Sequence, residues 1–138
     1  ALRGTQLRAH SRGHSTVLDD DGRMALTPDV LITRDGEPIC VVDAKYKLSA
    51  PTAARRPPSA EDVYQMLAYC VGYQVAEAVL VYPERLESGV PVTITRPSIA
   101  VRIHPIGLDL SGNSASFDAA CAALVGAVVA MGPAMAWL

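Results

Sequence analysis

The chain has 138 residues, of which 50% are hydrophobic and 19% are charged, with a formal net charge of −2. These values fit one globular domain with a sizeable core and exclude an intrinsically disordered chain. They also exclude a protein that binds nucleic acid through its overall charge. Any contact with nucleic acid must therefore be local or shared with a partner.

The N-terminal part of the chain predicts strands joined by tight turns. Residues 1–15 are polar and define no clear element, while residues 15–18 and 23–26 flank the turn-forming "DDDG" and predict a hairpin. Residues 29–33 predict a strand, "RDGEP" a turn, and residues 39–45 a second strand rich in β-branched residues. The proline-containing stretch "LSAPTAARRPPS" then predicts a loop.

A helix is predicted over residues 60–75, with Ser59 as its N-cap and acidic residues in its first turn. Three further strands are expected at residues 78–82, 92–95 and 99–106. A last helix should follow. The order of strands and helices predicts an α/β domain with a mixed central sheet flanked by helices.

The C-terminal run, residues 119–138, lacks charged residues and is long enough for a membrane span. It is mostly Ala, Gly and Val, contains Pro133 and lacks flanking Lys or Arg, so we expect a helix packed on the core and no membrane partner. The three cysteines, at positions 40, 70 and 121, have no disulfide or zinc spacing. They predict buried thiols in a reducing, cytoplasmic protein.

Acidic and basic residues stand at the ends of the two most apolar strands. Asp43 and Lys45 share one strand face because side chains alternate along a strand. The position of Asp29 depends on the turn between the strands. A two-residue turn centred on Asp35 and Gly36 places Asp29 opposite Val42, whereas a three- or five-residue loop centred on Gly36 places it opposite Asp43. A site that uses both carboxylates therefore requires the longer loop.

Two facing carboxylates repel each other unless a cation lies between them or one of them is protonated. Their oxygen atoms suit Mg²⁺ or Mn²⁺, and a metal held by two carboxylates keeps positions for water and a phosphate oxygen. A nearby lysine can stabilise charge on that phosphate or help to activate the water. The alternative is that Asp29 and Asp43 are solvated strand ends and that Lys45 and Lys47 are ordinary surface cations.

In the predicted helix, Gln65 and Tyr69 lie four residues apart and share one face, with Asp62 one turn earlier. Tyr64, Gln65 and Tyr69 are therefore candidates to point into the site. The alternative is an ordinary amphipathic helix with Gln65 in solvent and half-buried tyrosines. In the loop before the helix, Arg55 and its neighbour in sequence could contact a phosphate backbone or simply be solvated.

These residues resemble a known signature. "PD" at residues 28–29 followed by "DAK" at residues 43–45 is similar to the PD-(D/E)XK nuclease motif, and "QMLAY" at residues 65–69 is similar to the Q-x-x-x-Y motif of its RecB-like branch. The string "TPDVLI…VVDAKYK…DVYQMLAYC…VLVYP", residues 27–83, more narrowly resembles the nuclease subunit of McrBC modified-cytosine restriction systems.

The resemblance implies a restriction-endonuclease-like fold, with residues 1–138 forming a single nuclease domain from the C-terminal part of a longer subunit. It implies Mg²⁺-dependent cleavage of DNA, with Mn²⁺ as a substitute. Asp29, Asp43 and the Ala44 carbonyl would be the metal ligands. Lys45 would be the catalytic lysine. Gln65 and Tyr69 would complete the catalytic group, by supporting the site or touching the DNA. The further candidates for binding DNA are Lys47, Arg55, Arg56 and Tyr64.

In that family the partner is a GTP-hydrolysing AAA+ subunit of the McrB type, which reads the modified base. A homodimer of nuclease domains is a second assembly that the resemblance allows. Many members of the superfamily also carry an acidic residue on a helix before the first aspartate, and residues 1–26 predict no such helix. Two other functions stay open: a catalytically silent domain of this fold that binds DNA or assembles a complex, and an enzyme that uses Lys45 as a Schiff-base nucleophile in a dry pocket.

Overall fold

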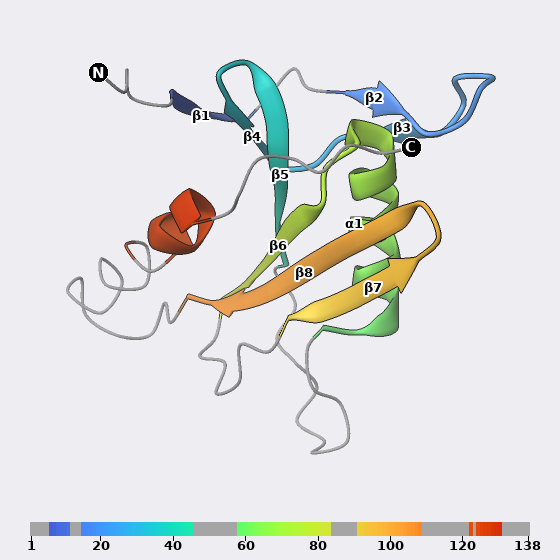
Figure 1. Cartoon of the computed structure of the whole chain (residues 1–138). Helices are drawn as coiled ribbons and strands as arrows, with labels where there is room; N and C mark the ends of the chain where they lie inside the picture. The colour runs from blue at the N-terminus through green and yellow to red at the C-terminus, as the bar shows by residue number, and fades with distance from the viewer. Residues whose placement is uncertain are drawn as a thin grey trace.

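The computed structural model describes residues 6–11, 15–45, 58–83, 91–108, 122 and 124–130 (Figure 1). Its strands are β1 (Leu7–His10), β2 (Thr16–Val17), β3 (Ala25–Leu26), β4 (Val30–Arg34), β5 (Glu37–Ala44), β6 (Glu77–Tyr82), β7 (Val92–Arg96) and β8 (Ile99–Gly107). Helix α1 spans Ala60–Tyr73, and residues 124–130 form a further helical segment.

Six strands form one mixed sheet in the order β1-β4-β5-β6-β8-β7, and β2 pairs with β3 in a separate two-stranded sheet. The β1–β4, β4–β5 and β7–β8 pairs are antiparallel, whereas β5–β6 and β6–β8 are parallel. The parallel β5–β6 pair needs a crossover, and α1 lies within that connection. The predicted α/β class with a mixed, restriction-endonuclease-like central sheet is confirmed.

The hairpin between β4 and β5 corrects the predicted loop. Arg34 pairs with Glu37, so the turn has two residues, and both Asp35 and Gly36 have positive φ, at 53° and 86°. Positive φ at both central residues is typical of a type I′ turn, whose twist matches the twist of the strands. Of the two turns considered, the two-residue turn is the one formed, and the expectation that a site using both aspartates requires a longer loop centred on Gly36 is wrong.

A β-bulge nevertheless brings the two aspartates together. The register runs from Thr33 paired with Pro38 to Ile32 paired with Cys40, so Ile39 is the extra residue. Proline cannot donate a ladder hydrogen bond, and bulges are among the few places where strands accept it. Beyond the bulge Val30 pairs with Val42, which sets the preceding Asp29 opposite Asp43.

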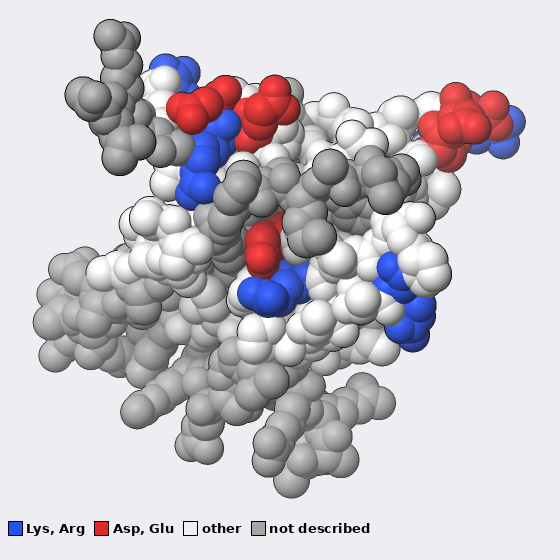
Figure 2. All heavy atoms as spheres, viewed as in Figure 1, with Lys and Arg blue, Asp and Glu red and all other residues white. Residues whose placement is uncertain are grey.

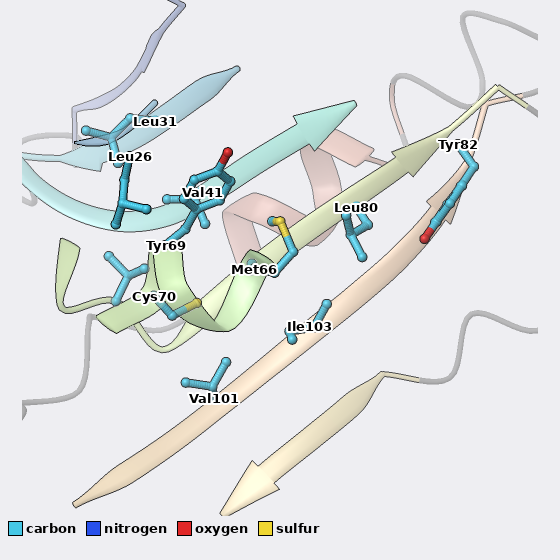
Figure 3. Close-up of a cluster of buried hydrophobic side chains, with 12 residues drawn as sticks. Leu26, Leu31, Val41, Met66, Tyr69, Cys70, Leu80, Tyr82, Val101 and Ile103 are labelled. Atoms are coloured by element: carbon cyan, nitrogen blue, oxygen red, sulfur yellow. The ribbon is translucent and has the colours of Figure 1, made fainter. Parts of the chain in front are cut away.

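The core lies on both faces of the sheet. On one face, α1 packs Met66 against strand residues such as Leu80 and Ile103, all of them 0% exposed (Figure 3). On the other face, a second cluster around Cys40 and Val79 contacts Leu124 of the C-terminal helical segment. The central strands are thus covered by a helix on each side, which agrees with the flanking helices predicted from sequence.

The ends of α1 follow from local chemistry. The Ser59 Oγ accepts a hydrogen bond from the Asp62 N–H at 3.2 Å, which confirms Ser59 as the N-cap. The helix ends two residues earlier than predicted, because Gln74 adopts the left-handed conformation with φ 56° and its N–H bonds back to the carbonyls of Cys70 and Val71.

Two of the three cysteines are described. Cys40 and Cys70 are free and 0% exposed, as predicted, and burial raises the pKa of Cys70 to about 12. Burial also raises the pKa of Cys40 well above its usual range. Cys121 lies outside the described residues, as does much of the uncharged C-terminal run. In the part of the chain that the structure describes, no helix has the length and apolar character needed to cross a membrane.

Candidate active site

The candidate site lies at one edge of the central sheet. Asp29 directly precedes β4, Asp43 is the penultimate residue of β5, and Tyr82 ends the neighbouring parallel strand β6. The carboxyl ends of β5 and β6 thus meet beside the start of β4. In open α/β sheets, ligands bind beyond the carboxyl ends of the parallel strands. The topology therefore gathers these side chains where such sheets usually place a functional site.

Two hydrogen bonds join the segments of Asp29 and Asp43 across the hairpin. The Ala44 N–H donates to Asp29 Oδ2 at 2.8 Å, and the Asp29 N–H donates to Asp43 Oδ1 at 3.3 Å. Asp43 is only 6% exposed, whereas Asp29 is exposed to solvent. The carboxylates are consequently fixed by main-chain hydrogen bonds, with one side of the pair open to water.

Lys45 joins the acidic pair to the helix. Its main-chain N–H donates to the Val81 carbonyl at 2.8 Å, which fixes the residue at the end of β5. Its Nζ lies 2.9 Å from Asp43 Oδ2 and also donates to Gln65 Oε1. The side chain is 11% exposed. Lys45 is therefore oriented by partners from both the strand and the helix.

Gln65 connects Lys45 with Tyr69. Its Nε2 donates to the Tyr69 hydroxyl at 3.1 Å, while its Oε1 accepts from Lys45. Burial, and next the negative charge of Asp43, raise the pKa of Tyr69, so its hydroxyl stays protonated at neutral pH. The structure thus brings together the five residues predicted for catalysis.

The electrostatics of Asp43 show a site short of positive charge. Burial is the main cause that raises the pKa of Asp43, and the Asp29 carboxylate raises it further, while Lys45 acts in the opposite direction. A buried carboxylate beside another carboxylate is costly unless a cation compensates both charges. Lys45 therefore compensates this pair only in part.

The donor set suits a hard divalent cation. Asp29 and Asp43 present carboxylate oxygens, and the Ala44 N–H already points to Asp29, so its carbonyl faces the same edge of the extended strand. Oxygen ligands of this kind favour Mg²⁺ or Mn²⁺. Among the described residues, no group of three His, Cys, Asp or Glu side chains could hold a metal. The carbonyl and water would have to complete the coordination.

Sequence reasoning did not assign a role to Asp62 and Tyr82 in the site. Asp62 is 5% exposed, its Oδ2 accepts from the Tyr82 hydroxyl at 2.9 Å, and its Oδ1 lies 3.9 Å from Lys45 Nζ. A signal was present in the helix, because residues 62, 65 and 69 recur at steps of three and four. The Tyr82 partner, twenty residues away at the end of β6, had no comparable signal.

Other predicted residues are not placed in this cluster. Tyr64 is 69% exposed and lies about 100° around α1 from Gln65, and the structure does not place it in this cluster. Its contact with DNA stays a prediction. Lys47, Arg55 and Arg56 lie outside the described residues. Residues 6–11 and 15–28 contain no helix that could carry an upstream acidic ligand.

The fold and the site define an α/β protein with a candidate metal site, built from oxygen ligands, at the edge of a mixed sheet. A family model described as "McrBC 5-methylcytosine restriction system component" matches residues 3–83, more than half of the chain. The chain therefore belongs to this family. No curated protein matches it.

A solved structure is also similar to the chain. It is a half-complex of Thermococcus gammatolerans McrB AAA+ hexamers with bound McrC, from a tetradecameric assembly. The match has 16% sequence identity and a TM-score of 0.45, and it covers 72% of this chain. The chain spans only 25% of the length of the chain it matches there. A likeness of this level transfers neither an activity nor a partner.

Proposed function

We propose that this chain is the DNA-cleaving domain of a modified-cytosine restriction system and that it hydrolyses phosphodiester bonds with a divalent cation. The observation that carries the proposal is the pairing of Asp29 with Asp43 across neighbouring strands, with the Lys45 ammonium 2.9 Å from Asp43. Membership of a family of 5-methylcytosine restriction components supports it. So does the PD-(D/E)XK-like order of these residues in the sequence.

Mg²⁺ or Mn²⁺ would be held by Asp29, Asp43 and the Ala44 carbonyl. When bound, such a cation supplies an electrophile for a phosphate oxygen and lowers the pKa of a water ligand. The charges favour it, because Asp29 and Asp43 bring two carboxylates together and, among the described residues, the ammonium that contacts this pair is that of Lys45.

The chain's own residues would orient and stabilise the reacting phosphate. Lys45 can donate a hydrogen bond to a phosphate oxygen and stabilise the negative charge that develops there. Gln65 holds the ammonium, and Tyr69 holds Gln65. Asp29 and Gln65 are both exposed, which leaves the site open to a substrate as large as DNA. A Schiff-base role for Lys45 needs an apolar pocket, and its ammonium is bonded to polar partners instead.

DNA binding by the chain alone should be weak. On the face drawn in Figure 2, the described Lys and Arg side chains form small separate groups, most of them beside Asp or Glu. Non-specific affinity for DNA depends on phosphate neutralisation by such residues. Lys47, Arg55, Arg56 and Tyr64 are the candidates for contacting DNA. We therefore propose that an AAA+ GTPase of the McrB type delivers modified DNA to the nuclease domain.

The function is tested by incubating methylated and unmethylated plasmid with the protein, with and without the cognate GTPase, GTP and Mg²⁺. We expect cleavage of the methylated plasmid that requires Mg²⁺ and is strongest with the GTPase. Chelation by EDTA should abolish it, because no protein side chain replaces the cation. A protein that cleaves neither plasmid under any of these conditions would favour the catalytically silent domain.

A further inference from the structure

Asp62 is an acidic residue whose burial the helix alone does not explain. Its N–H is capped by Ser59, as expected in the first turn, and a first-turn carboxylate can remain in solvent as its exposed neighbour Glu61 does. Asp62 instead turns inward and is 5% exposed. Buried carboxylates require compensating partners. The inward orientation therefore indicates a role for the Asp62 carboxylate beneath the surface.

Two partners meet that carboxylate from the sheet. The Tyr82 hydroxyl, at the end of β6, donates to Asp62 Oδ2 at 2.9 Å. The other oxygen, Oδ1, lies 3.9 Å from Lys45 Nζ, within ion-pair range but beyond hydrogen-bond length. Tyr82 thus fixes one oxygen and leaves the other facing the ammonium group.

Lys45 has acceptors on several sides. Asp43 lies 2.9 Å away on the strand, and Gln65 and Asp62 approach from α1. A lysine ammonium has three donors, so its two hydrogen-bonding partners, Asp43 and Gln65, together with the charge of Asp62 can hold it in one direction. If a cation shares the Asp43 carboxylate, the attraction between Asp43 and Lys45 weakens. Asp62, which approaches the ammonium from α1, would then help to keep Lys45 in place.

We propose that Asp62, fixed by Tyr82, is a positioning residue that holds the Lys45 ammonium in its catalytic orientation. The expected effect of Asp62 on cleavage rests on the proposed nuclease function. The orientation of Lys45 by Asp62 does not depend on that function. Asp62 acts through Lys45, whose Nζ lies 3.9 Å from Asp62 Oδ1, and among the described residues it forms no three-residue ligand group with Asp29 and Asp43.

The test uses Asp62→Asn, which keeps the shape and the acceptor for Tyr82 but removes the charge. Its matched control is Glu61→Gln, which removes the adjacent first-turn charge from an exposed position. For cleavage of methylated plasmid with the cognate GTPase, we expect Asp62→Asn to lower kcat about 10- to 100-fold, the usual effect of losing an outer-shell partner. KM for DNA should stay unchanged, and the affinity for Mn²⁺ should fall only slightly, because the removed charge faces Lys45 and not the cation. Tyr82→Phe should act in the same direction with a smaller loss.

A second measurement reads Lys45 without relying on cleavage. The chain contains only two lysines, Lys45 and Lys47, so trace labelling with acetic anhydride can compare them within one molecule by mass spectrometry. We expect Asp62→Asn to raise the labelling rate of Lys45 relative to Lys47 several-fold, because the ammonium loses a partner. Glu61→Gln should leave that ratio unchanged.

Each outcome has a distinct meaning. Unchanged Lys45 labelling in Asp62→Asn would overturn the positioning role, and loss of Mn²⁺ binding would make Asp62 a ligand instead. If wild type never cleaves DNA but Asp62→Asn still raises the labelling of Lys45, the nuclease function fails while the contact between Asp62 and Lys45 stands.

Discussion

Asp43→Asn should reduce Mg²⁺-dependent cleavage by about 10³-fold, since a metal ion contributes several kcal/mol of transition-state stabilisation and ~4 kcal/mol corresponds to that factor. The amide keeps the shape of the side chain and an acceptor for the Asp29 N–H, but it is a poor ligand for a hard cation. Burial and Asp29 already raise the pKa of Asp43, so removing its charge should cost the fold little. Initial cleavage rates on methylated plasmid measure the effect.

The control is Asp20→Asn, which removes a carboxylate from an exposed position between β2 and β3. It changes the net charge equally and should cleave at the wild-type rate. Thermal unfolding should show that both variants are folded. Wild-type cleavage by Asp43→Asn would refute the assignment of the metal site.

Lys45→Met should separate metal binding from catalysis. The Lys45 Nζ lies 2.9 Å from Asp43 Oδ2 and therefore competes with a cation for that oxygen. Removing the ammonium also makes the site more negative, so Mn²⁺ should bind more tightly than in wild type. Cleavage should nevertheless fall by about 10²- to 10³-fold, the usual cost of losing a preorganised charge stabiliser.

Lys45→Met should thus raise the affinity for Mn²⁺ while lowering the cleavage rate. A general loss of structure would lower both. Arg23→Met is a charge-matched control, since Arg23 is exposed near the β2–β3 turn. It should change neither cleavage nor Mn²⁺ affinity. A Lys45→Met variant that cleaves at the wild-type rate would show that the lysine is a structural cation and not part of the reaction.

Much of the fold could be predicted because its elements carry strong local patterns. Strands β4, β5, β6 and β8 are apolar runs bounded by turn residues, and Ser59 marks the start of α1. Strand β1 escaped prediction because it has only four residues, "LRAH", which are partly polar and which pair with β4 at the edge of the sheet. Local patterns of this kind cannot indicate a strand whose formation depends on a distant partner.

The sequence was enough to predict the residues of the candidate site. It was not enough to predict the turn, the bulge and the distant contact that bring them together. Counting residues from the turn led to a longer loop, whereas a type I′ turn with a bulge at Ile39 produces the same opposition of Asp29 and Asp43. Pro38 was the available hint, because proline is accepted at strand bulges. The Tyr82 hydroxyl that donates to Asp62 comes from the end of β6, twenty residues along the chain, and no local pattern reveals that contact.

The central claim is that Asp29 and Asp43 together hold a divalent cation. Its most direct test is a Mn²⁺ titration followed by electron paramagnetic resonance on wild type, Asp29→Asn, Asp43→Asn and the control Asp20→Asn. We predict that wild type and Asp20→Asn bind Mn²⁺ and that either site variant loses this binding. Equal Mn²⁺ binding by all four proteins would contradict the claim.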